Sequence, residues 1–405
     1  MKIAVIGGGP AGMLAAIEIA KAGKEVVLFE KNEKTGKKLF ITGKGRCNIT
    51  NNCTEEEFLK NVISNPKFLY RAIYSFPCNA TMDFFENLGV PLKTERGNRV
   101  FPQSDKSSDI LKALNKALEK SKVKVRLNTE VKDIIKEEDG FTVVSTHKES
   151  FDGVVIATGG ITYTQTGSTG DGYKFATEFG HTIVKPVGVL NAMISSEKLN
   201  LAGLTLKNVL FKVSKGKKTL YAEQGELLFT HNGISGPVVL SASSCIAREN
   251  FKELKFYIDL KPALTNEVLD NRVLRDFESN KNRDFGNSLN GLLPLSMIPV
   301  VVRRTGISPN KKVNSITKEE RAKLVDVLKN FEVKVISLAD DNFGIITQGG
   351  INVKEINPSN MMSKLVENLF FVGETLDVDG FTGGFNLQIA LSTGYLCGKY
   401  IGENL

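Results

Sequence analysis

A glycine-rich turn near the N-terminus has the spacing that phosphate binding requires. Gly7-Gly8-Gly9-Pro10-Ala11-Gly12 matches G-x-G-x-x-G. In such a turn the first glycine permits the tight bend, the second admits a pyrophosphate to the backbone N–H groups, and the third lets helix and strand pack closely. Glu30 follows at about the 20-residue distance at which a carboxylate accepts both hydroxyls of an adenosine ribose. Because that carboxylate would repel a 2′-phosphate, the spacing predicts a dinucleotide other than an NADP-type ligand.

The elements around the turn form the pattern of a βαβ unit. Residues 2–6 read as a short apolar strand, residues 13–22 as an Ala/Ile-rich helix, and residues 25–29 as a second strand. This order would place the pyrophosphate at the positive end of the helix dipole. A glycine-rich turn in an ordinary α/β protein is the alternative. The strand, the helix and the acid at this distance together favour the dinucleotide site.

Two later segments bear on the same ligand. A buried-strand pattern over residues 151–157 runs into Ala157-Thr158-Gly159-Gly160, whose small residues let backbone pass close to a dinucleotide. Another buried strand, over residues 368–372, ends in Gly373-Glu374, where an acid can accept hydrogen bonds from a polyol. FAD has a ribitol between its pyrophosphate and its reactive ring, and NAD has no polyol there. The chain also shows no second G-x-G-x-x-G unit, so the three segments predict FAD.

The last predicted helix, over residues 386–401, also suits a flavin. It begins at Gly383-Gly384-Phe385-Asn386-Leu387, where the glycines permit a close backbone approach. A reduced flavin accumulates negative charge at N1 and the C2 carbonyl. Free N–H groups and a helix dipole of about half a positive charge would stabilise that anion. An ordinary glycine-rich helix start is the alternative, and Glu374 just upstream favours the flavin.

These segments resemble those of the two-dinucleotide-binding-domain flavoproteins of the glutathione-reductase superclass. Four stretches resemble the signature of the HI0933-like (BaiN/YhiN-type) flavoprotein family: residues 36–51 with Gly-Arg-Cys-Asn, 225–237, 347–351, and 373–388 with Asp-Val-Asp-Gly. The resemblance covers essentially the whole chain. It implies an FAD-dependent, often NAD(P)H-linked, oxidoreductase. Within that family some members are described as aminoacetone-oxidase-like, and others as reducing a conjugated C=C bond in 3-oxo steroid (bile acid) substrates.

The resemblance also implies which residues bind FAD. It assigns the first turn to the pyrophosphate, Glu30 and Lys31 to the adenosine end, and the backbone of Val131 to adenine. Lys38 and Arg46 would lie along pyrophosphate and ribitol, and Glu374 would bind the ribitol. The complete set of expected FAD-binding residues is Gly7, Gly9, Pro10, Ala11, Gly12, Glu30, Lys31, Lys38, Arg46, Asn48, Val131, Ala157, Thr158, Gly159, Gly373, Glu374, Gly384, Phe385, Asn386 and Leu387.

No residue is assigned as the catalyst, and the candidates are Arg46, Cys47 and His231. Cys47 could be a reactive thiol beside the flavin, but a small packed residue is the favoured interpretation. His231 could donate a proton, and a structural histidine is the favoured alternative. No cluster has metal-ligand spacing, so no metal is predicted. Five cysteines without a C-x-x-C pair argue against a disulfide framework or a dithiol centre, and for a reducing cytoplasm.

A chain of 405 residues predicts two or three domains. The expected fold class is α/β: a doubly wound, Rossmann-like FAD-binding domain over residues 1–188 and 344–405. An antiparallel β-barrel plus helical domain is inserted over residues 189–343, with its helical part at about 264–330, and we expect the insertion to cover the ligand. No apolar run approaches the ~18 residues that span a bilayer, and the N-terminal strand leaves no room for a signal peptide.

The expected activity is flavin-mediated hydride transfer to or from a small organic substrate, such as a 3-oxo steroid-like compound. NAD(P)H is the expected transient electron donor. The net charge of +8 permits attraction to RNA, although the scattered lysines favour an ordinary solvated surface. A flavoprotein that modifies tRNA and a flavin-bearing sensor without turnover stay as alternatives. The substrate, the acid or base, and the oligomeric state are left open.

Overall fold

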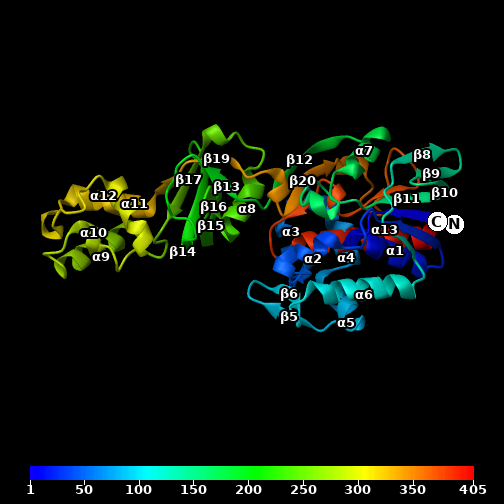
Figure 1. Cartoon of the computed structure of the whole chain (residues 1–405), viewed down its shortest axis with the longest axis horizontal. Helices are drawn as coiled ribbons and strands as arrows, with labels where there is room; N and C mark the ends of the chain where they lie inside the picture. The colour runs from blue at the N-terminus through cyan, green and yellow to red at the C-terminus, as the bar shows by residue number, and fades with distance from the viewer. The chain divides into compact units, whose positions relative to one another are not determined.

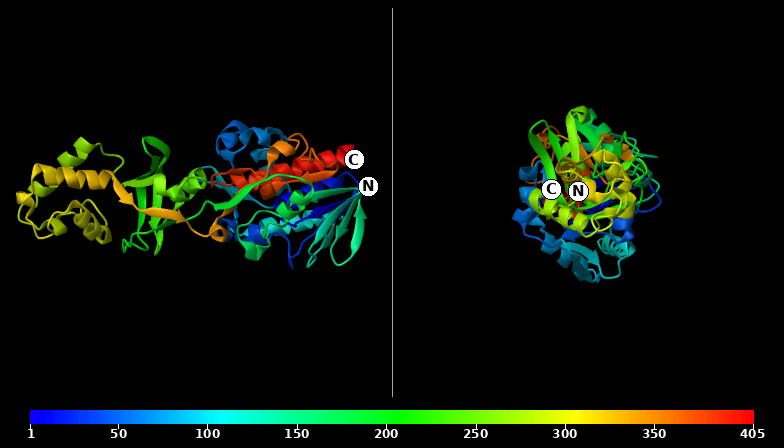
Figure 2. Two further views of the ribbon diagram at one scale, coloured as in Figure 1. Left: turned by 90° about the horizontal axis from the view of Figure 1, so that it is seen from above. Right: turned by 90° about the vertical axis from the view of Figure 1, so that its left-hand side faces the viewer.

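The computed structural model describes residues 1–405, apart from the side chain of Lys44. Its contacts divide the chain into two units, one formed by Met1–Val189 with Asp340–Leu405 and the other by Leu190–Ala339 (Figure 1). Each unit has a hydrophobic core of its own. The first unit is therefore built from both ends of the chain, and Figure 2 shows those ends, in blue and red, lying together within it.

A five-stranded parallel sheet is the centre of the first unit. Its order is β21-β11-β1-β2-β7, and every neighbouring pair is parallel. A parallel sheet covered on both faces needs continuous apolar strands, which explains the buried runs in the sequence. The strands are β1 (Lys2–Ile6), β2 (Glu25–Phe29), β7 (Lys124–Arg126), β11 (Gly153–Ile156) and β21 (Leu369–Phe371).

The first and last long helices of the chain pack directly on each other. α1 (Pro10–Lys21) follows β1, and α13 (Phe385–Asn404) ends the chain. A Cβ on Gly394 would lie 2.3 Å from the carbonyl oxygen of Ala11, and one on Gly398 would lie 2.6 Å from that of Ala15. Glycine at these α13 positions therefore permits the backbones of the two helices to approach closely. The two helices therefore run in the same direction, with Gly394 of α13 opposite Ala11 at the start of α1.

Smaller antiparallel sheets and short helices complete the first unit. The sheets are β8 (Asp133–Glu137), β9 (Gly140–Val144) and β10 (Lys148–Phe151); β3 (Thr50–Asn51), β5 (Leu92–Glu95) and β6 (Arg99–Pro102); β12 (Ile183–Val189) with β20 (Ile346–Ile351); and β4 (Val62–Ser64) with β22 (Asp379–Gly380). The helices are α2 (Lys37–Ile41), α3 (Glu55–Lys60), α4 (Tyr70–Ser75), α5 (Cys78–Asn87), α6 (Ser107–Lys120) and α7 (Asp171–Glu178).

The second unit contains a seven-stranded antiparallel sheet in the order β18-β17-β14-β15-β16-β13-β19. Its two edge strands are consecutive in the chain and separated only by Lys334. This continuous segment pairs with both ends of the sheet, which closes it into a barrel-like form. The strands are β13 (Met193–Ser195), β14 (Thr205–Lys215), β15 (Lys218–Phe229), β16 (Gly233–Ser235), β17 (Leu254–Asp259), β18 (Phe331–Val333) and β19 (Val335–Leu338).

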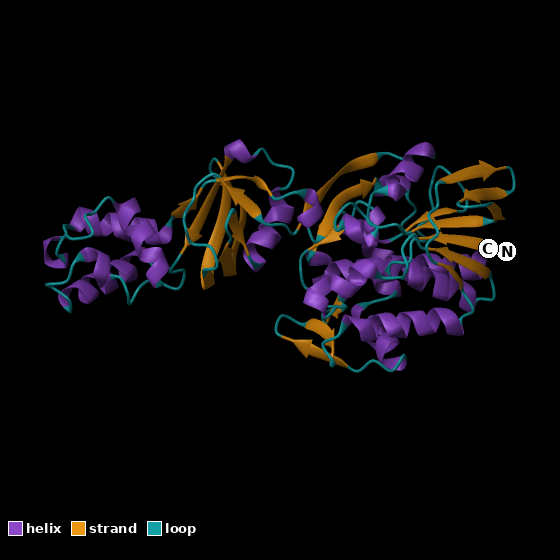
Figure 3. Ribbon diagram, in the orientation of Figure 1, coloured by secondary structure: helices purple, strands orange, loops and turns teal.

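Helices α9–α12 gather at one end of this second unit, and helix α8 lies beside the strands at the other (Figure 1 and Figure 3). The helix starts follow capping rules: Thr265 caps α9 through the N–H of Val268, and Thr317 with Glu320 forms a capping box on α12. The helices are α8 (Pro237–Ile246), α9 (Asn266–Glu278), α10 (Phe285–Ser288), α11 (Ile298–Thr305) and α12 (Lys318–Lys329). The predicted class, a Rossmann-like parallel sheet with an antiparallel and helical insertion, is confirmed.

Candidate cofactor site

The turn between β1 and α1 combines two tightly packed glycines with one that faces open space. Gly7 has a φ of +107°, and a Cβ there would lie 2.4 Å from the carbonyl oxygen of Ala157. A Cβ on Gly12 would lie 2.1 Å from the Gly7 carbonyl oxygen. At Gly9, by contrast, no described atom beyond its chain neighbours lies within 4 Å of such a Cβ. Gly7 and Gly12 therefore permit packing, and Gly9 leaves room for a ligand.

The N-terminus of α1 is suited to an anion. Gly9 is the N-cap, Pro10 stands in the first turn, and no described side chain caps the helix or places an acid in that turn. The first N–H groups of a helix have no partner within it. Together with the helix dipole, they make this end a ready phosphate site.

Glu30 is fixed directly beside the turn. Its residue is 8% exposed, and its Oε2 accepts a hydrogen bond from the N–H of Gly8 at 2.9 Å. Oε1 accepts from the backbone N–H and the side-chain amide of Asn32, at 2.8 and 2.7 Å. A carboxylate has about four acceptor positions. Glu30 is thus held by three donors and keeps capacity for a ligand hydroxyl, as the ribose role requires.

The second segment ends beside the start of α7. Thr158 Oγ1 accepts from the N–H of Gly172 at 3.0 Å, and Gly159 adopts a φ of +77°. Lys31 Nζ lies 2.6 Å from a carboxylate oxygen of Asp171, the first residue of α7. The structure therefore brings Lys31 and Thr158, both predicted to bind FAD, to the same helix. Val131 is buried just before β8.

The third segment closes on the first. Gly373 has a φ of +72°, and a Cβ there would lie 2.8 Å from the Cβ of Ala11 in α1. The carboxylate of the next residue, Glu374, accepts from Lys38 Nζ at 2.8 and 2.9 Å. It also accepts from the N–H of Thr347 at 2.8 Å. Lys38 and Glu374, which were predicted separately, thus form one ion pair beside the glycine turn.

The N-terminus of α13 is also without a side-chain cap among the described residues. Its N-cap Gly384 has a φ of +98°, and a Cβ there would lie 2.3 Å from the Thr50 carbonyl oxygen. The side chain of Asn386 bonds both the N–H and the carbonyl of Gly380, at 2.8 Å each. Asn386 therefore shapes the loop that leads into the helix. Phe385 and Leu387 stand in the first turn, whose N–H groups suit a developing negative charge.

A buried acceptor tests whether these residues fit FAD. Asn48 Oδ1 is buried and has no hydrogen-bond partner among the described residues. Asn48 lies two residues before Thr50, whose backbone touches Gly384. A buried acceptor without a donor costs ~1–3 kcal/mol, so a ligand N–H is indicated here. The isoalloxazine ring carries such a donor at N3, and the residues present therefore fit FAD.

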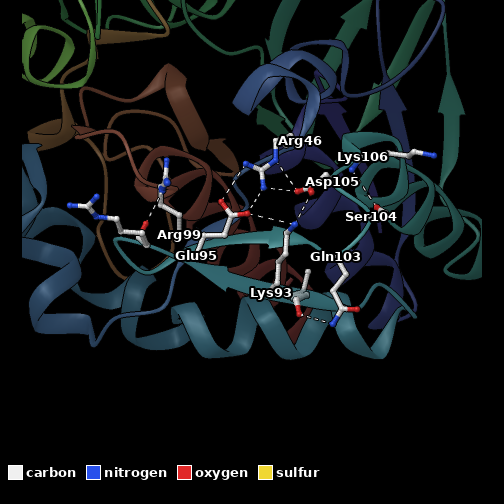
Figure 4. Close-up of polar contacts among 10 residues, drawn as sticks. Arg46, Lys93, Glu95, Arg99, Gln103, Ser104, Asp105 and Lys106 are labelled. Carbon is white, nitrogen blue, oxygen red and sulfur yellow. Dashed lines mark hydrogen bonds and ion pairs between the residues drawn. The ribbon is translucent and has the colours of Figure 1, made fainter. Parts of the chain in front are cut away.

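Arg46 is engaged by the β5–β6 hairpin (Figure 4). Its guanidinium binds the carboxylates of Glu95 and Asp105, and it lies 4.1 Å from the ring centroid of Phe101. Lys93 Nζ reaches Asp105 at 2.7 Å and Glu95 at 3.6 Å. The hydrogen bonds that Arg46 donates, first to Glu95 and then to Asp105, raise the pKa of its guanidinium. The arginine therefore clamps a hairpin, and its FAD-binding and catalytic roles stay predictions.

The other two catalytic candidates have contrasting environments. Cys47 is fully buried, with a φ of +60°, and burial raises the pKa of its thiol to about 12. A protonated, enclosed thiol is a poor nucleophile, which agrees with the favoured packing role. His231 is exposed in the loop between β15 and β16 of the second unit. Among the described residues, neither Cys47 nor His231 has a contact that supports a catalytic role.

The sequence analysis missed several residues that the fold brings to this region. Thr347 donates to Glu374, and Gln388 accepts from Thr50 Oγ1 at 2.5 Å. No described group of three or more His, Cys, Asp or Glu side chains could hold a metal ion.

Comparisons with known proteins agree over almost the entire chain. The family described as HI0933-like protein Rossmann domain matches residues 1–400. A "3-dehydro-bile acid delta(4,6)-reductase" of Clostridium scindens is 30% identical over 417 residues, covering 99% of each chain. A "ribosomal RNA dihydrouridine synthase" of Escherichia coli is 28% identical over 401 residues, covering 98% of this chain and 96% of the relative.

Among solved structures, the 3-ketosteroid Δ1-dehydrogenase of Sterolibacterium denitrificans is similar in fold. Its TM-score is 0.55 at 14% identity, with 100% of this chain and 99% of that chain covered. At this identity the likeness concerns the fold alone. In the part of the chain that the structure describes, no helix has both the length and the apolar character to cross a bilayer.

Proposed function

Since this chain belongs to the HI0933-like family of FAD-dependent oxidoreductases, we propose that it reduces a carbon–carbon double bond conjugated to a carbonyl group. Family, fold class and enzyme class agree with the expectations from sequence. The observation that carries the proposal is the convergence of the three predicted segments: Ala157 lies against Gly7, and Gly373 lies against Ala11. When bound, FAD supplies hydride transfer at its N5 atom.

Each part of the site has a role in this proposal. The N-terminus of α1 and the open position at Gly9 bind the pyrophosphate, and Glu30 binds the adenosine ribose. Glu374 accepts from the ribitol while Lys38 balances its charge. Asn48 accepts a hydrogen bond from the flavin ring. The N-terminus of α13 stabilises negative charge on the reduced ring, which favours hydride acceptance from a donor such as NAD(P)H.

A small enone is the first candidate substrate. The bile-acid reductase is 30% identical over 99% of both chains, and its name describes removal of double bonds conjugated to a 3-oxo group. A 3-oxo steroid-like compound has the same electron-poor double bond. The carbonyl draws electrons away from the β-carbon, which is the position that accepts hydride. A small substrate also agrees with the interpretation that the net charge of +8 comes from scattered, solvated lysines.

Uridine in RNA is the second candidate, favoured by a separate observation. Two relatives named as ribosomal RNA dihydrouridine synthases are each 28% identical and match 98% and 97% of this chain. The C5=C6 bond of uridine is also conjugated to a carbonyl, so both candidates share one type of reaction. The net charge of +8 would assist binding of a polyanion.

The deciding experiment is anaerobic and uses the FAD-loaded protein. NADH and NADPH are first compared as donors by loss of the visible flavin absorbance. The reduced protein is then mixed with a 3-oxo-Δ4 steroid, with ribosomal RNA lacking dihydrouridine, and with a saturated ketone as control. We expect the enone or the RNA to restore the absorbance and the saturated ketone to leave it unchanged. The proposal would be overturned if neither the steroid nor the RNA reoxidised the reduced flavin, or if the protein did not take up FAD.

A further inference from the structure

The second unit contains a cavity that plays no part in the proposed function. It has a volume of about 190 Å³ and lies between strand β14 and the loop that precedes helix α11. The exposed residues Thr205 and Pro294 are part of its lining, so a ligand can reach it from solvent. Six apolar residues of this unit's hydrophobic core also line it: Leu206, Val209, Leu260, Leu292, Leu293 and Met297.

Two lysines line the same cavity. Lys207 is exposed, and Lys261 is half-buried. Lys207 and Asn208 lie at a bulge of β14, where the register against β15 shifts between Leu206 and Val209. A bulge changes the direction of side chains on the bulged strand. The two lysines therefore bring positive charge to a cavity whose other walls are largely apolar.

The surroundings of Lys261 add positive charge to this wall. The Arg272 guanidinium donates to the carbonyl of Gly291 at 3.4 Å, next to the cavity residue Leu292. Its ion pair with Asp276 is long, at 3.7 Å. Burial, and then the charge of Arg272, lower the pKa of Lys261. The ammonium form of this lysine is therefore disfavoured unless an anion lies beside it.

The acid closest to Lys261 in sequence is already paired. Asp259 accepts from the backbone N–H of Lys261 at 2.9 Å, but its carboxylate also lies 2.5 Å from Lys329 Nζ. Among the described residues, no ion pair includes Lys207 or Lys261. A half-buried ammonium without a counter-charge is costly. An anion bound in the cavity would supply the missing charge.

We propose that this cavity binds a small organic acid with one carboxylate and an apolar body, of the size of benzoate. The carboxylate accepts from Lys261 Nζ, Lys207 adds attraction, and the ring packs on the leucines. Since an apolar cavity of about 150 Å³ holds benzene, 190 Å³ leaves room for a ring and a carboxylate. Inorganic phosphate would balance the lysines but leave the apolar wall without a partner. The site lies within the second unit and does not depend on the proposed function.

The test is isothermal titration calorimetry of the FAD-loaded, full-length protein with sodium benzoate at constant ionic strength. We expect one saturable site per chain, with a Kd of about 1 mM or lower. Acetate lacks the ring, benzyl alcohol lacks the charge, and inorganic phosphate has the charge alone. Each of these three compounds should bind at least about tenfold more weakly than benzoate.

Matched variants locate the site. Lys261→Met should weaken benzoate binding about tenfold or more. Lys255→Met is the control and should leave the affinity unchanged, because Lys255 is an exposed residue of β17 that does not line the cavity. Lys207 is exposed, so Lys207→Met is expected to fold even if Lys261→Met does not. It should weaken benzoate binding roughly threefold.

Three results would contradict the proposal. The first is the absence of saturable benzoate binding by the unmodified protein up to about 10 mM. The second is binding of acetate, benzyl alcohol or phosphate as tightly as benzoate. The third is an unchanged benzoate affinity in every lysine variant that folds, because benzoate would then bind elsewhere on the protein.

Discussion

Lys38 and Glu374 are 336 residues apart in sequence, yet the lysine Nζ lies 2.8–2.9 Å from both oxygens of the carboxylate. Their side chains are 19% and 22% exposed. The pair ties helix α2, near the N-terminus, to the segment that follows strand β21. It therefore fixes the acid that we assign to the ribitol.

Replacing Lys38 with Met should weaken both the fold and cofactor binding. Glu374 would lose its charged donor in a largely enclosed position, which costs about 1.5–3 kcal/mol in the free energy of unfolding. FAD affinity should fall roughly tenfold or more. Urea unfolding and flavin titration measure the two effects. Lys112→Met is the matched control, because Lys112 is 80% exposed and lies 3.9 Å from Asp109 on helix α6. Equal results for both variants would contradict the assignment.

Gly9→Ala separates cofactor binding from folding. Gly9 has a φ of −77°, which alanine adopts freely, and a Cβ there meets no described atom within 4 Å. The free energy of unfolding should therefore fall by no more than about 1 kcal/mol, which is the usual cost of alanine at a helix N-cap. A methyl group in the space left for the pyrophosphate should nevertheless lower FAD affinity roughly tenfold or more.

Two other glycine variants serve as controls for Gly9→Ala. Gly291→Ala lies in the second unit, also with open space around its Cβ, and should alter neither stability nor flavin binding. Gly12→Ala, whose Cβ would lie 2.1 Å from a backbone oxygen, should destabilise the protein itself. Unchanged FAD affinity in Gly9→Ala would show that the pyrophosphate does not bind at this turn.

Local signals explain why so much of the first turn was predictable from sequence. The roles of Gly7 and Gly12 follow from backbone geometry within a few residues, and Glu30 follows at a distance set by one βαβ unit. The parallel strands other than the edge strand β7 were predictable because burial on both faces demands continuous apolar runs. These features need no knowledge of the rest of the chain.

Long-range contacts explain what the sequence did not predict. Nothing close to Arg46 in sequence indicates that the carboxylates of Glu95 and Asp105 will bind its guanidinium. Thr50 and Gln388 come together only because strand β3 meets helix α13. The barrel-like closure depends on a strand that changes partners around Lys334. In each case the residue that makes the contact is distant in sequence, and no sequence pattern predicts the contact.

Arg46→Gln should loosen the β5–β6 hairpin without much effect on flavin binding. The guanidinium holds Glu95 and Asp105 and covers Phe101, and glutamine can provide neither its charge nor its stacking surface. Faster hydrogen exchange at β5 and β6 is the expected result, with FAD affinity within about twofold of the parent. A loss of FAD affinity as large as that expected for Lys38→Met would indicate that Arg46 binds the cofactor.

His181 predicts the pH dependence of stability. Its ring is buried, with Nε2 2.8 Å from Ser363 Oγ, Nδ1 3.2 Å from Glu355, and an edge-on contact with Phe371. Burial lowers the pKa of this histidine below the ordinary 6.5, although Glu355 opposes the shift. As pH falls through 6.5, the unfolded chain takes up a proton that the folded protein resists.

The contribution of neutral His181 is therefore complete above about pH 6.5 and declines as the pH falls toward its lowered folded value. The loss is at most about 1.4 kcal/mol per pH unit. Urea unfolding at several values between about pH 7.5 and 5.5 measures it, in a range above the titration of ordinary carboxylates. His181→Gln should flatten the decline, whereas His147→Gln, at an exposed position, should preserve it. An identical decline in all three proteins would mean that another group carries the dependence, since a residue absent from the variant cannot take up the proton.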